Sequence, residues 1–270
     1  MSNLIVSMTF DDALDSHLDI AVPMLEERGF HGTFFVNLNA QSFVGRFSEW
    51  QTIAKKGHEL GNHTIFHPAI SAKSYISEGN ALENYSLDRM LIELKTANQL
   101  LFAIDGRQER TFAYPCSNPI LGQPGMAKRL LRQSGLERTR IAGWVYKFPF
   151  LDVFSREKNY SCLLPELFYT ARGGGFGNRS KIIEKNDRYF VPCVCADGLK
   201  AAQLQENLNR FRKEGNWLVF MFHGIGSGHH LVCEHPDFGY LLDKLSDDRG
   251  ISVLPFLQAA RMLWGKNADA

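Results

Sequence analysis

The sequence contains no long apolar run. A transmembrane helix needs about 20 consecutive apolar residues, and no such stretch occurs in the 270 residues of the chain. The N-terminus, residues 1–6 (MSNLIV), lacks the basic region of a secretory signal and leads into a polar motif within a few residues. We therefore expect no signal peptide, no membrane-spanning segment and a cytoplasmic location.

An excess of charge of either sign is also missing. Thirty basic and 29 acidic residues give a formal net charge of +1. We also find no basic or acidic block in the sequence, so nothing in the charge argues for nucleic acid, a membrane surface or a polyanion as a partner.

Cysteine is scarce, with five residues scattered through the chain. Cys193 and Cys195 have the wrong spacing for a zinc knuckle, and no second pair completes one. We expect reduced, mostly buried thiols of the kind found in cytosolic proteins.

Short apolar runs alternate with amphipathic segments along the chain. This alternation predicts a parallel sheet, open or closed into a barrel, in a single domain spanning residues 1–270. Residues 139–190 fit the pattern poorly, so we interpret them as an irregular insertion. The expected strands are 5–10, 33–36, 58–62, 111–114, 217–222 and 251–254. The expected helices are 19–29, 48–57, 87–101, 126–133, 199–213 and 238–245, with a short one at the end.

Reactive side chains follow four of the expected strands. Asp11 and Asp12 follow the first, residues 63–67 (HTIFH) the third, residues 114–116 the fourth and His223 the fifth. In a parallel barrel these positions converge on the C-terminal rim, where such enzymes build their active sites.

His63 and His67 have the spacing of two ligands on one face of a helical turn. Thr64 stands where the HExxH zinc motif carries its glutamate, so a third ligand and a base must come from elsewhere. Either histidine could instead be an exposed or core residue, and the aspartate pair could simply cap a helix. Two imidazoles and one carboxylate together suit a divalent metal ion, most readily zinc, with cobalt, nickel, manganese or iron as alternatives.

Adjacent aspartates at a strand end point in different directions, so one of them can reach the ion comfortably. We assign Asp12 to the metal and Asp11 as the general base that deprotonates the metal-activated water. His223, across the rim, is placed to protonate a leaving nitrogen, although a single histidine at a strand end is more often a plain hydrogen-bonding residue.

Three motifs resemble those of the polysaccharide deacetylase family, which is also called the NodB-homology family or carbohydrate esterase family four. They are residues 9–13 (TFDDA), residues 63–67 (HTIFH) and residues 220–223 (FMFH). The resemblance implies Asp11 as base, His223 as acid and Asp12, His63 and His67 as metal ligands; that list also matches the assignments above. It further implies a distorted (β/α) barrel with fewer than eight repeats, and a carbohydrate substrate.

The family's third motif, R-x-P-Y, departs from the pattern: residues 113–116 read AYPC. The family uses the backbone N–H of the last residue to stabilise an oxyanion, which Cys116 can still supply, and Tyr114 and Pro115 would line the substrate site. Ala113 stands at the position where the motif has arginine. Arg172 or Arg140 could take its place, and we favour Arg172 because it begins a glycine-rich loop, residues 172–178, although that loop could equally be a flexible turn.

Five other residues carry weaker expectations. Asp197 is a candidate for the acidic residue of the family's fourth motif. Trp217 is expected in the core, and His229, His230 and His235 on a solvent-facing polar loop.

The combined pattern predicts a metal-dependent hydrolase that removes an acyl group, which we expect to be acetyl, from an amide nitrogen of an amino sugar or polysaccharide. A small nucleotide- or lipid-linked amino sugar would also fit. One alternative is a hydrolase of a small cyclic amide or ureide, as in the allantoinase-like branch of the fold. The other is a non-catalytic carbohydrate-binding relative.

Overall fold

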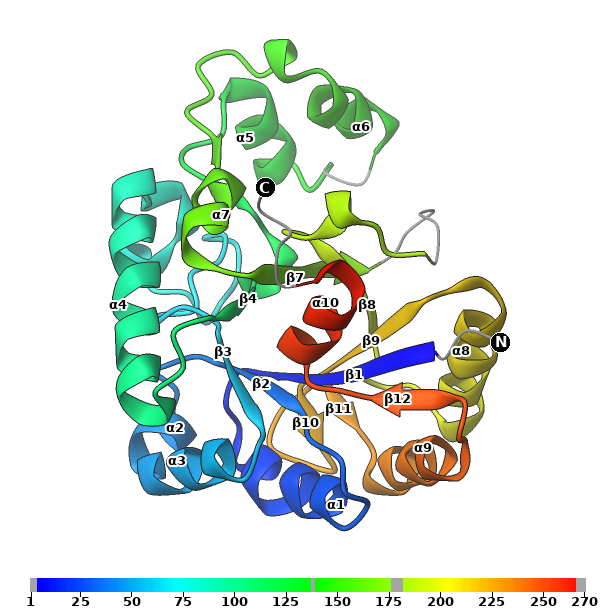
Figure 1. The fold of residues 1–270 in the computed structure, drawn as a ribbon. Coiled ribbons are helices and arrows are strands. Elements are labelled where there is room, and N and C mark those ends of the chain that lie inside the picture. The colour runs from blue at the N-terminus through cyan, green and yellow to red at the C-terminus, as the bar shows by residue number, and fades with distance from the viewer. Residues whose placement is uncertain (1–3, 137–138, 176–181, 266–270) are drawn as a thin grey trace.

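Seven parallel strands form a closed barrel in the structure, a computed structural model that describes residues 4–136, 139–175 and 182–265. Figure 1 shows these strands at the centre of the molecule, with helices around them. In hydrogen-bonding order they are β1 (Leu4–Asp11), β2 (Thr33–Val36), β3 (Glu59–Asn62), β4 (Thr111–Ala113), β7 (Thr170–Gly175), β8 (Val191–Cys195) and β9 (Trp217–Phe222). The barrel closes because β9 pairs with β1.

An eighth strand, β12 (Ile251–Val253), joins the wall beside β1. It pairs with residues 4–6 of β1, whereas β2 pairs with residues 9–11. Two short strands, β12 and β2, thus pair with different parts of the same edge of β1, and this makes the barrel irregular at that edge. The predicted distorted (β/α) barrel of about seven repeats is confirmed.

The strands are apolar runs because both faces of the barrel wall are covered. All eight residues of β1 are buried. On its outer face the ring of Phe10 stacks on Phe34 and Phe222, with centroids 4.8 and 5.2 Å apart. The alternate residues of β1 point the other way, into the barrel, which is how Asp11 comes to face the interior.

Helices pack around the outside of the barrel. The longest, α4 (Leu87–Asp105), begins at Ser86, whose hydroxyl accepts a hydrogen bond from Arg89 N, and ends at Gly106 with φ +67°. No helix in the described ranges is both long and apolar enough to cross a membrane. The other covering helices are α1 (Val22–Glu26), α2 (Gln41–Gly45), α3 (Phe47–Lys55), α7 (Leu164–Leu167), α8 (Ala201–Glu214), α9 (His235–Asp247) and α10 (Phe256–Trp264).

Sequence reasoning missed β7 and β8. Their sequences, TARGGG and VPCVC, contain the glycines and the proline that disfavour strands. Pairing with β4 and β9 nevertheless holds both strands in the wall. Part of the predicted insertion at 139–190 is therefore barrel.

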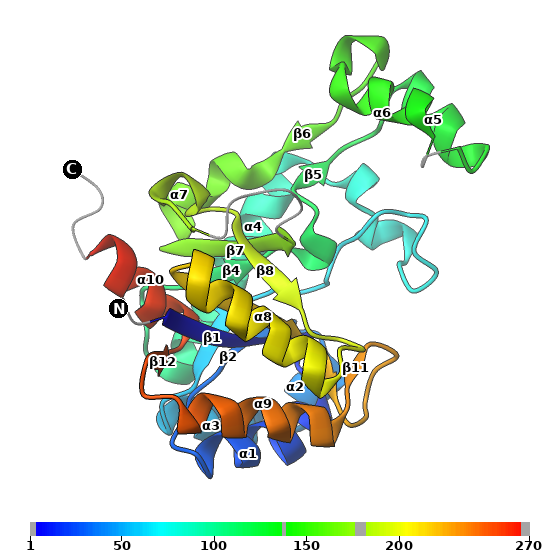
Figure 2. The same ribbon diagram turned by 90° about the vertical axis from the view of Figure 1, so that its right-hand side faces the viewer.

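Residues 139–159 of that range belong to a projection from the barrel. The strands β5 (Ile120–Leu121) and β6 (Lys158–Asn159) pair antiparallel, and α5 (Met126–Gln133) and α6 (Arg140–Lys147) lie between them in the chain. Figure 2 shows α5 and α6 standing away from the barrel. We call residues 122–157 the helical hairpin.

All five cysteines are free. Cys193 and Cys233 are buried, whereas Cys116, Cys162 and Cys195 are exposed. The expectation of mostly buried thiols is therefore wrong.

A buried carboxylate ties the N-terminal end of the barrel together. Glu59, at the start of β3, is only 3% exposed. It accepts hydrogen bonds from Thr33 Oγ1 at 2.8 Å and Leu257 N at 2.9 Å, and another from the hydroxyl of Thr111. Because Leu257 lies in the first turn of α10, Glu59 also caps that helix.

We expect Glu59→Leu to lower the free energy of unfolding by about 3 kcal/mol, because it leaves buried donors without an acceptor. Urea denaturation measures the change, with the exposed Glu206→Leu as the control. A loss below about 1 kcal/mol would show that Glu59 does not hold this end of the barrel.

Candidate metal centre

The three predicted ligands meet at the C-terminal rim of the barrel. Asp12 follows β1, and His63 and His67 follow β3. The Oδ1 atom of Asp12 lies 3.5 Å from His63 Nε2 and 3.3 Å from His67 Nε2. One ligand atom from each residue lies within 4.8 Å of the others, so the three side chains can share one ion.

The backbone between the histidines is a loop and not the helical turn that their spacing predicts. Thr64 and His67 have positive φ angles of +68° and +48°. Thr64 N donates to Asn62 Oδ1 at 2.7 Å, and His67 N donates to Thr64 Oγ1 at 2.9 Å. These side-chain acceptors hold the left-handed backbone, and the two rings still converge, with centroids 4.9 Å apart.

Hydrogen bonding leaves the ligand atoms directed at one another. His63 Nδ1 donates to Ala113 O at 2.8 Å, which leaves Nε2 as the ring nitrogen that faces Asp12. That Nε2 and Asp12 Oδ1 are buried and have no hydrogen-bond partner among the described residues. Burial lowers the pKa of His67 to about 4, so its imidazole is neutral. Two imidazoles facing a carboxylate are a donor set that fits a divalent cation.

Glu93 holds the histidine loop from behind, and sequence reasoning missed it. This α4 side chain is 5% exposed and accepts from Ile65 N and Phe66 N through Oε1, at 3.0 Å each. Its Oε2 accepts from Tyr85 Oη at 2.8 Å. The available signal was a charged residue next to Leu94 on the apolar face of an amphipathic helix.

Asp11 pairs with Arg172 inside the barrel. Asp11 Oδ2 and Arg172 Nη2 are 2.5 Å apart, and both side chains are buried. Arg172 lies in β7 and not in a loop; residues 176–178 of the expected loop lie outside the described residues. In the strand pairing Arg172 is opposite Ala113, the position at which the R-x-P-Y motif has arginine. The guanidinium therefore reaches Asp11 from the neighbouring strand.

The glycines after Arg172 have a packing role. A Cβ atom at Gly173 would lie 2.4 Å from the ring of Phe190, so the strand needs glycine there for close contact. Arg140, the second candidate for the missing arginine, is exposed on α6 of the helical hairpin.

His223 pairs with Asp197 on the other side of Asp12. His223 Nδ1 donates to Asp197 Oδ2 at 2.7 Å, and His223 N donates to Oδ1 at 3.0 Å. Its Nε2 is 3.8 Å from Asp12 Oδ2. Burial alone would lower the pKa of His223, but the hydrogen bond to Asp197 and the charge of Asp11 raise it above its ordinary value. A protonated imidazole is the form that can donate a proton.

Two further histidines support His223. His17 is buried; its Nε2 donates to His223 O at 2.8 Å and its Nδ1 accepts from Leu14 N at 3.2 Å. Burial lowers the pKa of His17 to about 4, which keeps it neutral. The ring of His229 stacks on that of His223, with centroids 5.1 Å apart.

The expectation of a solvent-facing loop therefore fails for His229, which is half-buried. His230 and His235 are exposed, as predicted, but His235 begins α9 and does not lie in a loop. Trp217 is buried in the core, also as predicted, and its Nε1 donates to Ser7 Oγ at 3.0 Å.

The side chains of the third motif, residues 113–116, point in different directions. Tyr114 is buried and its hydroxyl donates to Tyr189 O at 3.0 Å, so its ring belongs to the core and does not line a substrate site. Pro115 is buried too. Cys116 is exposed, has a φ of +51°, and places its Sγ 3.2 Å from Tyr75 Oη. Tyr75 thus brings a phenol to the place where the family motif ends in tyrosine.

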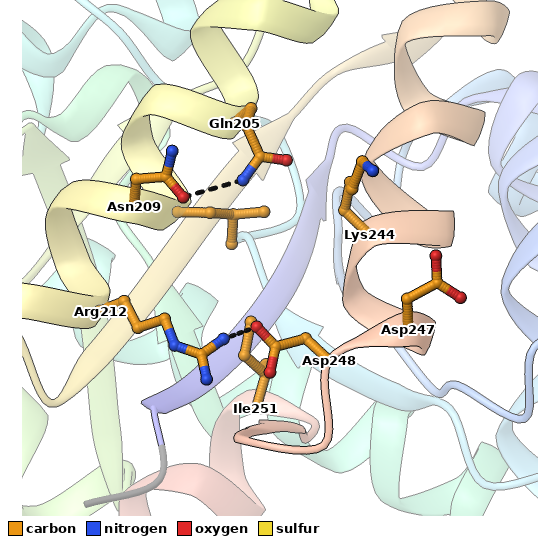
Figure 3. Close-up of a pocket in the computed structure, with 8 residues that line it drawn as sticks. Gln205, Asn209, Arg212, Lys244, Asp247, Asp248 and Ile251 are labelled. Carbon is orange, nitrogen blue, oxygen red and sulfur yellow. Dashed lines mark hydrogen bonds and ion pairs between the residues drawn. The ribbon is translucent and has the colours of Figure 1, made fainter. Parts of the chain in front are cut away.

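A pocket of about 270 Å³ lies between α8 and α9, away from these residues (Figure 3). Ile251, at the start of β12, places it near the N-terminal end of the barrel. Its polar side chains include two partnered sets: Arg212 with Asp248, and Gln205 with Asn209. None of the predicted site residues lines this pocket.

Structural comparison supports the fold. The chain superposes on the crystal structure of a "putative polysaccharide deacetylase" from Mycobacterium smegmatis with a TM-score of 0.59 and 15% identity, covering 97% of this chain and 90% of the other. It also matches a family 4 acetyl xylan esterase from Clostridium thermocellum in complex with a cobalt ion, with a TM-score of 0.53 and 16% identity, covering 97% and 92%.

Sequence comparison identifies the family. A chitin deacetylase from Arthroderma benhamiae is 32% identical over 95 residues, which are 35% of this chain and 25% of that protein. The matches span a quarter or less of the length of the curated relatives. The family model for polysaccharide deacetylase matches residues 2–135, about half of the chain, which include Asp12, His63 and His67. The chain belongs to the polysaccharide deacetylase family.

Proposed function

We propose that the protein is a metal-dependent hydrolase that removes an acyl group, in the first instance acetyl, from the amide nitrogen of an amino sugar. One observation carries this proposal: Asp11 and His223, each held by its own charged partner, flank the Asp12, His63 and His67 cluster. A base and an acid on either side of a metal site are the arrangement that amide hydrolysis requires.

In this proposal Asp12, His63 and His67 hold the ion, with zinc as the first candidate. Such an ion, when bound, supplies Lewis-acid chemistry that lowers the pKa of water and polarises a carbonyl. The hydrogen bond from His63 to Ala113 O orients one ligand, and Glu93 holds the loop that carries both histidines.

The remaining residues move protons. Asp11, oriented by Arg172, takes a proton from the water that attacks the carbonyl carbon. His223, oriented by Asp197, gives a proton to the nitrogen as the carbon–nitrogen bond breaks, which releases an amine and a carboxylate. We assign the backbone N–H of Cys116 to the carbonyl oxygen while negative charge develops there.

The chitin deacetylase relative supports an N-acetylated sugar as the substrate class. Hydrolysis of a small cyclic amide is the alternative, because the same base, acid and metal site would open such a ring. A non-catalytic role in carbohydrate binding is the third possibility. Against it, Asp11 and His223 both keep the hydrogen-bonded partners that an acid and a base need.

We expect the protein, after treatment with a chelator, to bind one zinc or cobalt ion and to gain thermal stability. Saturation at 100 times the dissociation constant would add about 2.7 kcal/mol. His67→Ala should weaken binding at least about tenfold in a calorimetric titration, whereas the exposed His235→Ala should not. Unchanged binding by His67→Ala would place the ion elsewhere.

Removing the base should stop turnover and leave the metal in place. Asp11→Asn is expected to lower kcat by about 100-fold or more, with metal content unchanged by elemental analysis. Asp15→Asn, an exposed neighbour, is the matched control. Full activity of Asp11→Asn would refute the assignment of Asp11 as base.

Assays with and without chelator distinguish the substrate classes. Acetate release from N-acetylated chito-oligosaccharides, abolished by the chelator, is the expected result. Ring opening of a cyclic ureide without acetate release would favour the cyclic-amide alternative. Binding of the oligosaccharide with no turnover of either class would favour the non-catalytic alternative.

A further inference from the structure

The helical hairpin concentrates basic charge. Residues 122–157 contain seven basic and three acidic residues, in a chain whose formal net charge is only +1. The rest of the chain is therefore net acidic, which hides this local excess in any whole-chain count. Such a charge asymmetry attracts an anionic surface.

Two of the three acidic residues are used inside the hairpin. Asp152 is buried and accepts from Gly125 N and Lys128 N at 2.9 and 3.0 Å. Glu157 pairs with Lys128 Nζ. The outward-facing charge is consequently basic, and it is carried by exposed Arg129, Arg140, Lys147 and Arg156.

The hairpin also exposes large apolar side chains. Eight of the 19 such side chains in the described part of the chain lie between residues 126 and 154. Trp144 is 67% exposed and Phe150 75% exposed, and Phe148 lies between their rings, with centroids 5.9 and 5.8 Å away. The other six are Met126, Leu130, Leu136, Leu151, Val153 and Phe154. Soluble surfaces seldom gather so many in one place.

Phe154 adds a conformational observation. Its ring is 82% exposed, and its φ is +64°, a backbone conformation that costs free energy for a bulky residue. Folding alone gains little from this arrangement, because the ring packs against so little of the protein. The strained turn displays an aromatic ring to whatever lies outside the hairpin.

We propose that the helical hairpin binds the surface of an anionic lipid bilayer. Exposed Trp, Phe and Leu side chains enter the interfacial region, while arginine and lysine contact the lipid phosphates. A soluble polyanion would use the basic residues without the apolar ones, and a dimer joined hairpin to hairpin would bring two basic surfaces together. The segment that leads through β5 into the hairpin leaves the barrel after Cys116, at the rim that carries the metal ligands. Bilayer binding goes beyond the proposed hydrolysis and does not depend on it.

Flotation with vesicles tests the proposal on the full chain. We expect binding to phosphatidylcholine vesicles containing about one third phosphatidylglycerol, weaker binding to phosphatidylcholine alone, and a decrease as salt rises. The triple variant Trp144→Ser, Phe150→Ser and Phe154→Ser should bind at least about tenfold more weakly. The charge reversal Arg129→Glu, Arg140→Glu and Lys147→Glu should do the same.

The matched control is Ile92→Ser, Leu100→Ser and Phe102→Ser, three exposed apolar residues of α4, which should bind as the parent does. Circular dichroism confirms that each variant is folded. Failure of the parent to float, or flotation of either hairpin variant as strong as that of the parent, overturns the proposal. The proposal is also overturned if the parent forms a dimer but does not bind vesicles, and the apolar variant no longer forms that dimer. Sensitivity to charge reversal alone, with full competition by heparin, would instead identify a soluble polyanion.

Discussion

The site depends on one electrostatic constraint: a carboxylate and two imidazole lone pairs face one another across little more than 3 Å. Asp12, His63 and His67 come from the ends of two different strands, and the atoms that meet are turned away from other donors. A cation between them would be a ligand partner for all three side chains. The surroundings hold the three together, through the carbonyl of Ala113 and the carboxylate of Glu93.

The two proton-transfer residues, Asp11 and His223, are each held in place by a buried partner of opposite charge. Asp11 is fixed by a buried guanidinium and His223 by a buried carboxylate. The guanidinium comes from β7, one strand away from the place where the family motif carries it. Because Arg172 and Ala113 are opposite each other in parallel strands, a long side chain from either position reaches the same point above the rim. The register of β4 and β7 therefore keeps an arginine paired with Asp11, although the R-x-P-Y motif has lost its own arginine.

The sequence was informative where residue type and local spacing decide the structure. Buried parallel strands such as β1 and β9 are apolar runs, and the ligand residues follow strands, so both could be predicted. β7 and β8 could not, because tertiary pairing overrides their glycines and proline. The left-handed loop at Thr64 and the stacking of His229 on His223 arise from contacts distant in sequence. The basic hairpin was hidden because the charge was summed over the whole chain.

Anomalous X-ray diffraction from crystals grown with zinc or cobalt tests the central claim most directly. The account predicts one anomalous peak bonded to Asp12 Oδ1, His63 Nε2 and His67 Nε2, with Asp11 still paired to Arg172. A peak ligated by Asp11 or His223, or a fully loaded crystal whose ion lies away from Asp12, would contradict it.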